Sequence, residues 1–174
     1  AQSVGKIGRC IAFEANEQNY TKILKTIEIN QCANLSVEHI AISDKIGKTT
    51  FLHHQNSLMG HLAEVGDQLQ GTDLEYVETT TIDDYVNQKG LKDIAFIKLD
   101  IEGAELSAIN GAEETINQYK PILMIEVHTF PEVVMNAKPL VEKLLQWNYR
   151  VMHLGSGIEV DPRSFAGGHT LAEP

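Results

Sequence analysis

The chain has few cysteines and no long hydrophobic run. Cys10 and Cys32 are isolated in a sequence of 174 residues, so neither a disulfide framework nor a cysteine zinc site is expected. This composition favours a reducing compartment, and we predict a cytoplasmic location. A membrane-spanning helix needs about 18 to 20 consecutive apolar residues. The sequence contains no such run, and we expect neither a membrane span nor a signal peptide.

Basic residues are also scarce. The chain has 14 lysines and arginines against 24 aspartates and glutamates, a formal net charge of −10. This balance excludes nucleic acid and anionic membrane surfaces as main partners, because both attract basic proteins. Apolar residues make up 43% of the chain, which is enough to bury a core. We therefore predict one domain over residues 1–174.

Several common catalytic motifs are missing. The sequence has no G-x-G-x-x-G, P-loop, H-E-x-x-H or G-x-S-x-G pattern. Nicotinamide enzymes, ATPases, zinc proteases and α/β-hydrolases usually depend on these motifs. The sequence therefore offers no support for those four classes.

Strand and helix patterns alternate along the chain. The clearest strand, from Ile94 to Leu99, is apolar on both faces and ends at Asp100, and a helix begins near Ala104. Apolar residues on both faces predict burial on both sides, as in the middle of a parallel sheet. The last two strands, Tyr149–Leu154 and Thr170–Ala172, have no helix between them. The pattern predicts an α/β fold with a doubly wound, mostly parallel sheet and an antiparallel C-terminal edge.

Other elements follow from local signals. A helix begins after Asn16, and a capping box at Thr81 begins a second helix. Residues 37–42, 49–52, 75–80 and 122–127 are strand candidates. Asn110-Gly111 breaks the helix that follows Asp100, and a final helix has Pro139 in its first turn. Residues 53–71 have no clear pattern; we expect a long loop or a short helix there, and we expect this segment to contribute to acceptor specificity.

Polar residues close four of the predicted strands. They are Glu14, Ser43 with Asp44, Asp100 and His128. Ligands of open α/β sheets bind outside the carboxyl ends of the strands, so these residues are site candidates. Glu126 and His128 are two apart on a strand and share a face. A carboxylate beside an imidazole raises its basicity, which suits a general base that deprotonates a hydroxyl.

Each candidate also has a structural interpretation. Glu14 could be an acid favoured at a helix N-terminus, and Asp44 could form an Asx-turn. Glu126 and His128 could satisfy each other inside the protein. Asp100 and Glu102 could bind magnesium, although no spacing supplies further ligands and we expect no metal. Glu105 fits a first-turn helix acid.

Three segments carry a family resemblance: FIKLDIEGAEL, INGAEETI and KPILMIEVH. They resemble the FkbM family of S-adenosylmethionine-dependent methyltransferases, as do AFEANEQNY and IAISDKIGKTTF. The resemblance implies a class I methyltransferase-like, Rossmann-like fold and methyl transfer to a hydroxyl of a small molecule or sugar. It also implies that Glu14 binds the cofactor's ribose, that Ser43 and Asp44 contact its adenine and that Asp100 contacts its methionine portion. His128 is then the base, assisted by Glu126.

The sequence departs from this family at its start. A first strand and a glycine-rich turn are expected before Glu14, and neither is present. We therefore expect an N-terminally incomplete domain, completed by a missing segment or by another subunit in a homo-oligomer. The alternative function is a non-catalytic α/β binding or assembly module that keeps the methyltransferase scaffold.

Overall fold

The computed structural model describes residues 4–5, 7–53, 60–62, 74–128, 134–165 and 167–174. The chain forms two compact units, one of residues 1–41 and 46–80 and the other of residues 42–45 and 81–174. Most of the segment expected to contribute to acceptor specificity, residues 53–71, lies outside the described residues. Among the described helices, none is long and apolar enough to cross a membrane.

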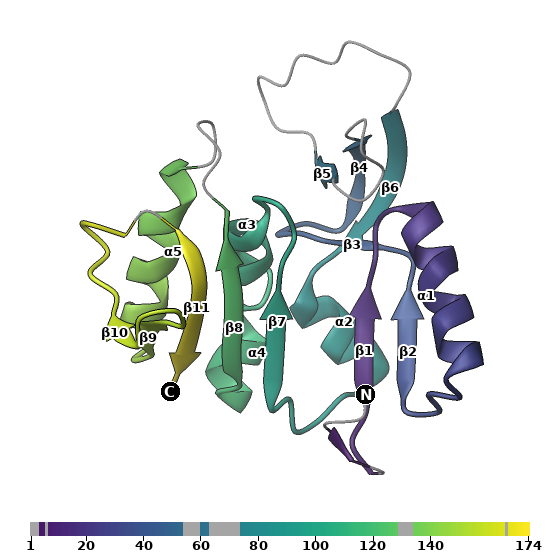
Figure 1. Ribbon diagram of the computed structural model, residues 1–174, viewed down its shortest axis with the longest axis horizontal. Coiled ribbons are helices and arrows are strands. Elements are labelled where there is room, and N and C mark those ends of the chain that lie inside the picture. The colour runs from purple at the N-terminus through teal and green to yellow at the C-terminus, as the bar shows by residue number, and fades with distance from the viewer. Residues whose placement is uncertain (1–3, 6, 54–59, 63–73, 129–133, 166) are drawn as a thin grey trace. The chain divides into compact units, whose positions relative to one another are not determined.

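The first unit opens with two parallel strands and the helix between them (Figure 1). Strand β1 (Cys10–Phe13) pairs with β2 (Leu35–Glu38), and α1 (Glu17–Ile29) connects them. The Asn16 side chain accepts a hydrogen bond from the Asn19 backbone N–H at 2.9 Å, which satisfies an otherwise orphaned donor of the first turn. The predicted helix and its cap are confirmed.

A second sheet follows, in the order β3-β6-β4-β5. Its strands are β3 (Ala41–Ile42), β4 (Gly47–His53), β5 (Gly60–Leu62) and β6 (Leu74–Thr80). The prediction of one strand over residues 37–42 is wrong, because β2 and β3 belong to different sheets. The chain leaves the first sheet at His39, whose ring stacks on Tyr20 with the centroids 4.9 Å apart. The two predicted strands at residues 49–52 and 75–80 are confirmed within β4 and β6.

The second unit contains a five-stranded sheet, in the order β10-β9-β11-β8-β7. Only β7 and β8 are parallel, and the other pairs are antiparallel, as predicted for the C-terminal edge. The strands are β7 (Phe96–Leu99), β8 (Ile122–Val127), β9 (Arg150–His153), β10 (Ile158–Glu159) and β11 (Gly168–Glu173). The helices are α2 (Ile82–Lys89), α3 (Glu105–Asn110), α4 (Glu113–Tyr119) and α5 (Val134–Gln146).

The architecture is mixed α/β, as predicted. Among the described strands, β1 pairs in parallel with β2 and β7 pairs in parallel with β8, and these pairs belong to different sheets. A single doubly wound parallel sheet across both units therefore stays a prediction.

The core of the second unit lies on one face of its sheet. Leu123 and Ile125 of β8 are fully buried, together with Ile109 of α3 and Leu140 of α5. On the other face, Phe96 of β7 is 53% exposed. The prediction that this strand is buried on both sides is wrong, because α3 packs against β8 and α5 against β9 on one face of the sheet (Figure 1).

The helix after Asp100 is interrupted where the sequence predicted. Helix α3 ends at Asn110, and α4 begins at Glu113. A Cβ at Gly111 would lie 2.2 Å from the Ser43 carbonyl oxygen, so only glycine fits without moving the backbone. The prediction that Pro139 lies in the first turn of the last helix is wrong, because α5 begins at Val134 and contains Pro139 in its interior.

Candidate functional site

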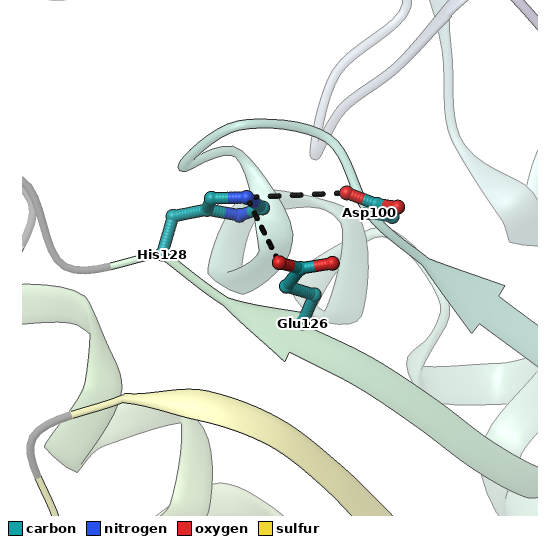
Figure 2. Close-up of side chains that lie close together, drawn as sticks. All are labelled: Asp100, Glu126 and His128. Carbon is teal, nitrogen blue, oxygen red and sulfur yellow. Dashed lines mark ion pairs between the residues drawn. The ribbon is translucent and has the colours of Figure 1, made fainter.

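Three predicted residues meet at the carboxyl ends of β7 and β8. The two strands are parallel neighbours, with Leu99 opposite Ile125, so the residues that follow them come together. Figure 2 shows the His128 ring directed toward both carboxylates. Its Nε2 lies 3.9 Å from Asp100 Oδ1 and 3.7 Å from Glu126 Oε1. The strand ends predict that Asp100 and His128 lie at one edge of a parallel sheet, and the structure confirms this for these two residues and for Glu126.

Glu105 organises the turn after β7 through hydrogen bonds to its backbone. Glu105 is only 2% exposed, and its Oε1 accepts hydrogen bonds from the backbone N–H groups of Ile101 at 3.3 Å and Gly103 at 3.2 Å. We had interpreted it as a first-turn helix acid, and it does lie in the first turn of α3. Its spacing to Ala108 and Ile109 places it on their buried helix face, which was the available signal.

The same carboxylate contacts the imidazole. Glu105 Oε1 lies 3.0 Å from His128 Nδ1, and Glu102 Oε2 lies 3.4 Å from Nε2. Burial lowers the pKa of His128, but the hydrogen bond to Glu105 and the charges of surrounding glutamates outweigh burial and raise it above 6.5. Near neutral pH this imidazole therefore holds a proton more strongly than a free one.

Basic side chains pair with two members of the site. Lys98 Nζ lies 2.7 Å from Asp100 Oδ2, and His169 Nε2 lies 3.0 Å from Glu126 Oε2. Burial raises the pKa of Asp100, but the Lys98 bond and the nearby positive charges lower it more. His169 reaches the site because it stands opposite Glu126 in the β8–β11 ladder. Spacing along the sequence could not reveal this pairing.

The other predicted residues make local contacts. Glu14 directly follows β1 in the first unit, and its Oε1 accepts the Asn16 backbone N–H at 2.8 Å. Ser43 and Asp44 follow β3, and the Ser43 hydroxyl donates to Asp44 Oδ1 at 3.3 Å. The Glu14 contact agrees with its interpretation as an acid at a helix N-terminus, whereas the Ser43 contact does not test the Asx-turn expected at Asp44. Their assignments to ribose and adenine stay predictions.

The geometry can be compared with that of a metal site. Asp100, Glu126 and His128 offer ligand atoms that all lie within 4.8 Å of one another. A divalent ion could use such a set, and Glu102 is not part of it. However, Asp100 and Glu126 already have cationic partners in Lys98 and His169. The protein itself thus provides positive charge for these carboxylates, and the magnesium alternative stays a prediction.

Comparisons with known proteins identify the family. Residues 1–151 match the model of the methyltransferase FkbM domain. The crystal structure of methyltransferase FkbM from Methylobacillus flagellatus KT is similar, with a TM-score of 0.61 and 20% sequence identity. The match covers 98% of this chain and 37% of that one, so this chain spans much less than the length of its structural relative. The comparison with curated proteins gave no significant match. On the family match over residues 1–151, the chain belongs to the FkbM methyltransferase family.

Proposed function

We propose that this protein transfers a methyl group from S-adenosylmethionine to a hydroxyl oxygen of a small molecule or sugar. The observation that supports this most directly is the position of His128. Its imidazole lies among carboxylates at the ends of two neighbouring parallel strands, in a chain of a methyltransferase family. Such an imidazole is the side chain best suited to remove a hydroxyl proton near neutral pH.

The charge of the site fits a cationic cofactor. Four carboxylates surround His128, from Asp100, Glu102, Glu105 and Glu126. S-adenosylmethionine carries a sulfonium and an ammonium group, and when bound it supplies an electrophilic methyl group. Asp100 is the most accessible of these carboxylates, with 38% of its side chain exposed, and we assign it to the ammonium group. We assign Glu14 to the ribose, and Ser43 and Asp44 to the adenine.

The protein's own residues would then bring the acceptor hydroxyl into line and remove its proton. Holding the reacting groups in line contributes much of the rate in such displacements. His128 accepts the hydroxyl proton through Nε2, and Glu126 stabilises the imidazolium that results. The pKa of His128 is raised, so its ring becomes basic at a higher pH than a free imidazole does. The proposed activity should therefore increase as the pH rises through that pKa.

Isothermal titration calorimetry tests the cofactor assignment. We expect S-adenosylmethionine and its demethylated product to bind at one site per chain, and Asp100→Asn to weaken binding of both by about tenfold or more, since a charge-assisted hydrogen bond is worth roughly 1.5–3 kcal/mol. Asp161→Asn is a matched control, because this exposed aspartate pairs with Arg163 instead. Equal affinities for Asp100→Asn and the unmodified chain would contradict the assignment.

The same titration tests whether residues 1–174 alone form the whole cofactor site and whether Glu14 binds the ribose. We propose that a further N-terminal segment or a second subunit completes the site. If so, an N-terminally extended chain should bind more tightly than residues 1–174 alone. Glu14→Ala should abolish binding if Glu14 holds the ribose. Absence of binding by both forms of the chain would refute the methyltransferase proposal and leave a non-catalytic module.

Both cysteines are free thiols, which is consistent with a proposed cytoplasmic location.

A further inference from the structure

The position of Glu105 in the first turn of α3 does not by itself explain why its carboxylate is buried. An acid favoured by the helix dipole acts from the surface, whereas only 2% of Glu105 is exposed. A buried carboxylate is costly unless hydrogen bonds and positive charge compensate it. Its Oε1 contacts the N–H groups of Ile101 and Gly103 and the Nδ1 of His128. The same oxygen therefore joins the turn after β7 to the residue after β8.

These contacts determine which of the two nitrogens of the His128 ring carries the proton when the ring is neutral. An ionised carboxylate can only accept hydrogen bonds, so the proton of a neutral His128 ring belongs on Nδ1, beside Glu105. The basic lone pair is then on Nε2. That nitrogen faces the side chains of Asp100, Glu102 and Glu126. Glu105 thus holds the ring in the tautomer that a base at this edge of the sheet requires.

Among the described residues, charged groups from several elements surround this ring. Glu105 comes from α3, Glu102 and Asp100 from the turn after β7, and Glu126 from β8. Lys98 offsets Asp100, and His169 from β11 offsets Glu126. Within this set Glu105 has the shortest contact with the imidazole, at 3.0 Å. Removal of the Glu105 carboxylate should therefore change the orientation and the pKa of the His128 ring more than removal of any other carboxylate in this set.

We propose that Glu105 is a positioning residue, which fixes the tautomer and orientation of His128 and ties it to the turn that carries Asp100. It acts through His128 and does not itself touch the reacting groups. The effect of Glu105 on methyl transfer rests on the proposed function. Its effect on the tautomer and orientation of His128 does not depend on that function and can be measured on the protein alone.

Nitrogen-detected NMR of the histidine rings tests the proposal directly. In the unmodified chain, we expect His128 above its pKa to carry its proton on Nδ1. Glu105→Gln should lower the pKa of His128 by about one unit or more, since one unit corresponds to a tenfold change in proton affinity. Glu114→Gln is the matched control, because Glu114 is an exposed acid in the first turn of α4. It should leave the pKa unchanged.

Two results would overturn the proposal. One is a neutral His128 with its proton on Nε2 in the unmodified chain, a measurement that needs no variant to fold. The other is a folded Glu105→Gln protein whose His128 pKa equals that of the unmodified chain. In Glu105→Ala, added acetate should restore the raised pKa, because a small carboxylate can accept the same N–H groups. Failure of acetate to do so would count against positioning by the carboxylate.

Activity measurements separate this inference from the proposed function. If methyl transfer is observed, Glu105→Gln should lower kcat with little change in the KM for S-adenosylmethionine. It should also move the rising limb of the pH profile to lower pH. A pKa change without any methyl transfer by any form of the chain would support the positioning of His128 and overturn the proposed function. Methyl transfer with an unchanged pH profile in Glu105→Gln would support the function and overturn the positioning.

Discussion

At the residue scale, the buried polar side-chain atoms of the described residues all have hydrogen-bond partners. Glu105 is compensated by backbone N–H groups and an imidazole. Thr170, which is fully buried in β11, donates its hydroxyl to the Ile125 carbonyl at 3.0 Å. Removing one partner of a buried hydrogen bond leaves the other desolvated, and the cost is then larger than the average value of the bond. Single substitutions at such pairs should therefore have measurable effects.

Tyr149 offers a clean test of this expectation. Its hydroxyl donates to the Pro121 carbonyl at 2.8 Å, and the residue is 2% exposed. Tyr149→Phe should lower the free energy of unfolding by about 1–2 kcal/mol, as measured by urea denaturation near neutral pH. Tyr119→Phe is the control, because its hydroxyl bonds the Leu91 carbonyl at a half-buried position. A larger loss in the control would contradict the prediction.

The same tyrosine has a defined pH dependence. Burial raises the pKa of Tyr149 from 10.0 to about 12, so the folded state favours the neutral phenol. This contribution is fully present below the unfolded pKa near 10 and disappears as the pH rises toward 12. The unmodified chain should therefore lose its advantage over Tyr149→Phe in this alkaline range.

At the scale of elements, helix ends connect parts of the second unit. Helix α2 has a local cap, in which Thr81 Oγ1 accepts the Asp84 N–H at 3.0 Å. Helix α4 has no side-chain cap of its own. Instead, Asp83 of α2 accepts the backbone N–H groups of Glu114 at 3.0 Å and Thr115 at 2.7 Å. One carboxylate therefore joins two helices that are separated in the sequence by β7 and α3.

Replacing this carboxylate should destabilise the protein. Asp83→Ala leaves two N–H groups at the start of α4 without their acceptor, and we expect a loss of about 1–2 kcal/mol in the free energy of unfolding. Gln88→Ala in the same helix removes the 2.7 Å bond between exposed Gln88 and Asp84, so it should cost less than about 0.5 kcal/mol. Equal losses in chemical denaturation would show that the bonds to α4 are unimportant.

At the scale of the whole molecule, the buried apolar side chains that the structure describes lie mostly in the second unit. Its fully buried residues include Ile109, Leu123 and Leu140. In the first unit, α1 has no buried residue, and every residue of β1 and β2 is only half-buried. A two-stranded sheet with an exposed helix has little apolar burial to stabilise it. The local stability of the two units should differ.

Hydrogen exchange measured by mass spectrometry checks this difference. Helices α1 and α5 are both 13 residues long, which makes them a matched pair. Amides of α5 near Leu140 and Leu144, which are fully buried, should exchange at least about tenfold more slowly than those of α1. Equal protection in the two helices would contradict the expectation.

Local signals predicted most of the elements. Thr81 with Asp84 predicted a capped helix, and Gly111 predicted an interruption, because both depend on a few adjacent residues. The change of sheet at His39 was missed because it depends on strand partners elsewhere in the chain. The strand ends also correctly brought Asp100 near His128, since parallel neighbours end at the same edge. The contacts of Glu105 and His169 could not be derived from spacing alone, because they arise from helix burial and from an antiparallel register.

The turn after β7 bears on the cofactor that the proposed function requires. Glu102 and Gly103 both have positive φ values, 54° and 105°, and N–H groups of the turn converge on a carboxylate. In other proteins a similar convergence of backbone N–H groups binds phosphate, but here Glu105 of the same chain already fills the position. ATP would have to displace that carboxylate and would meet the negative charge of Asp100 as well. Under the proposed function, we therefore expect this turn to disfavour phosphorylated adenosine compounds and to favour those that carry positive charge.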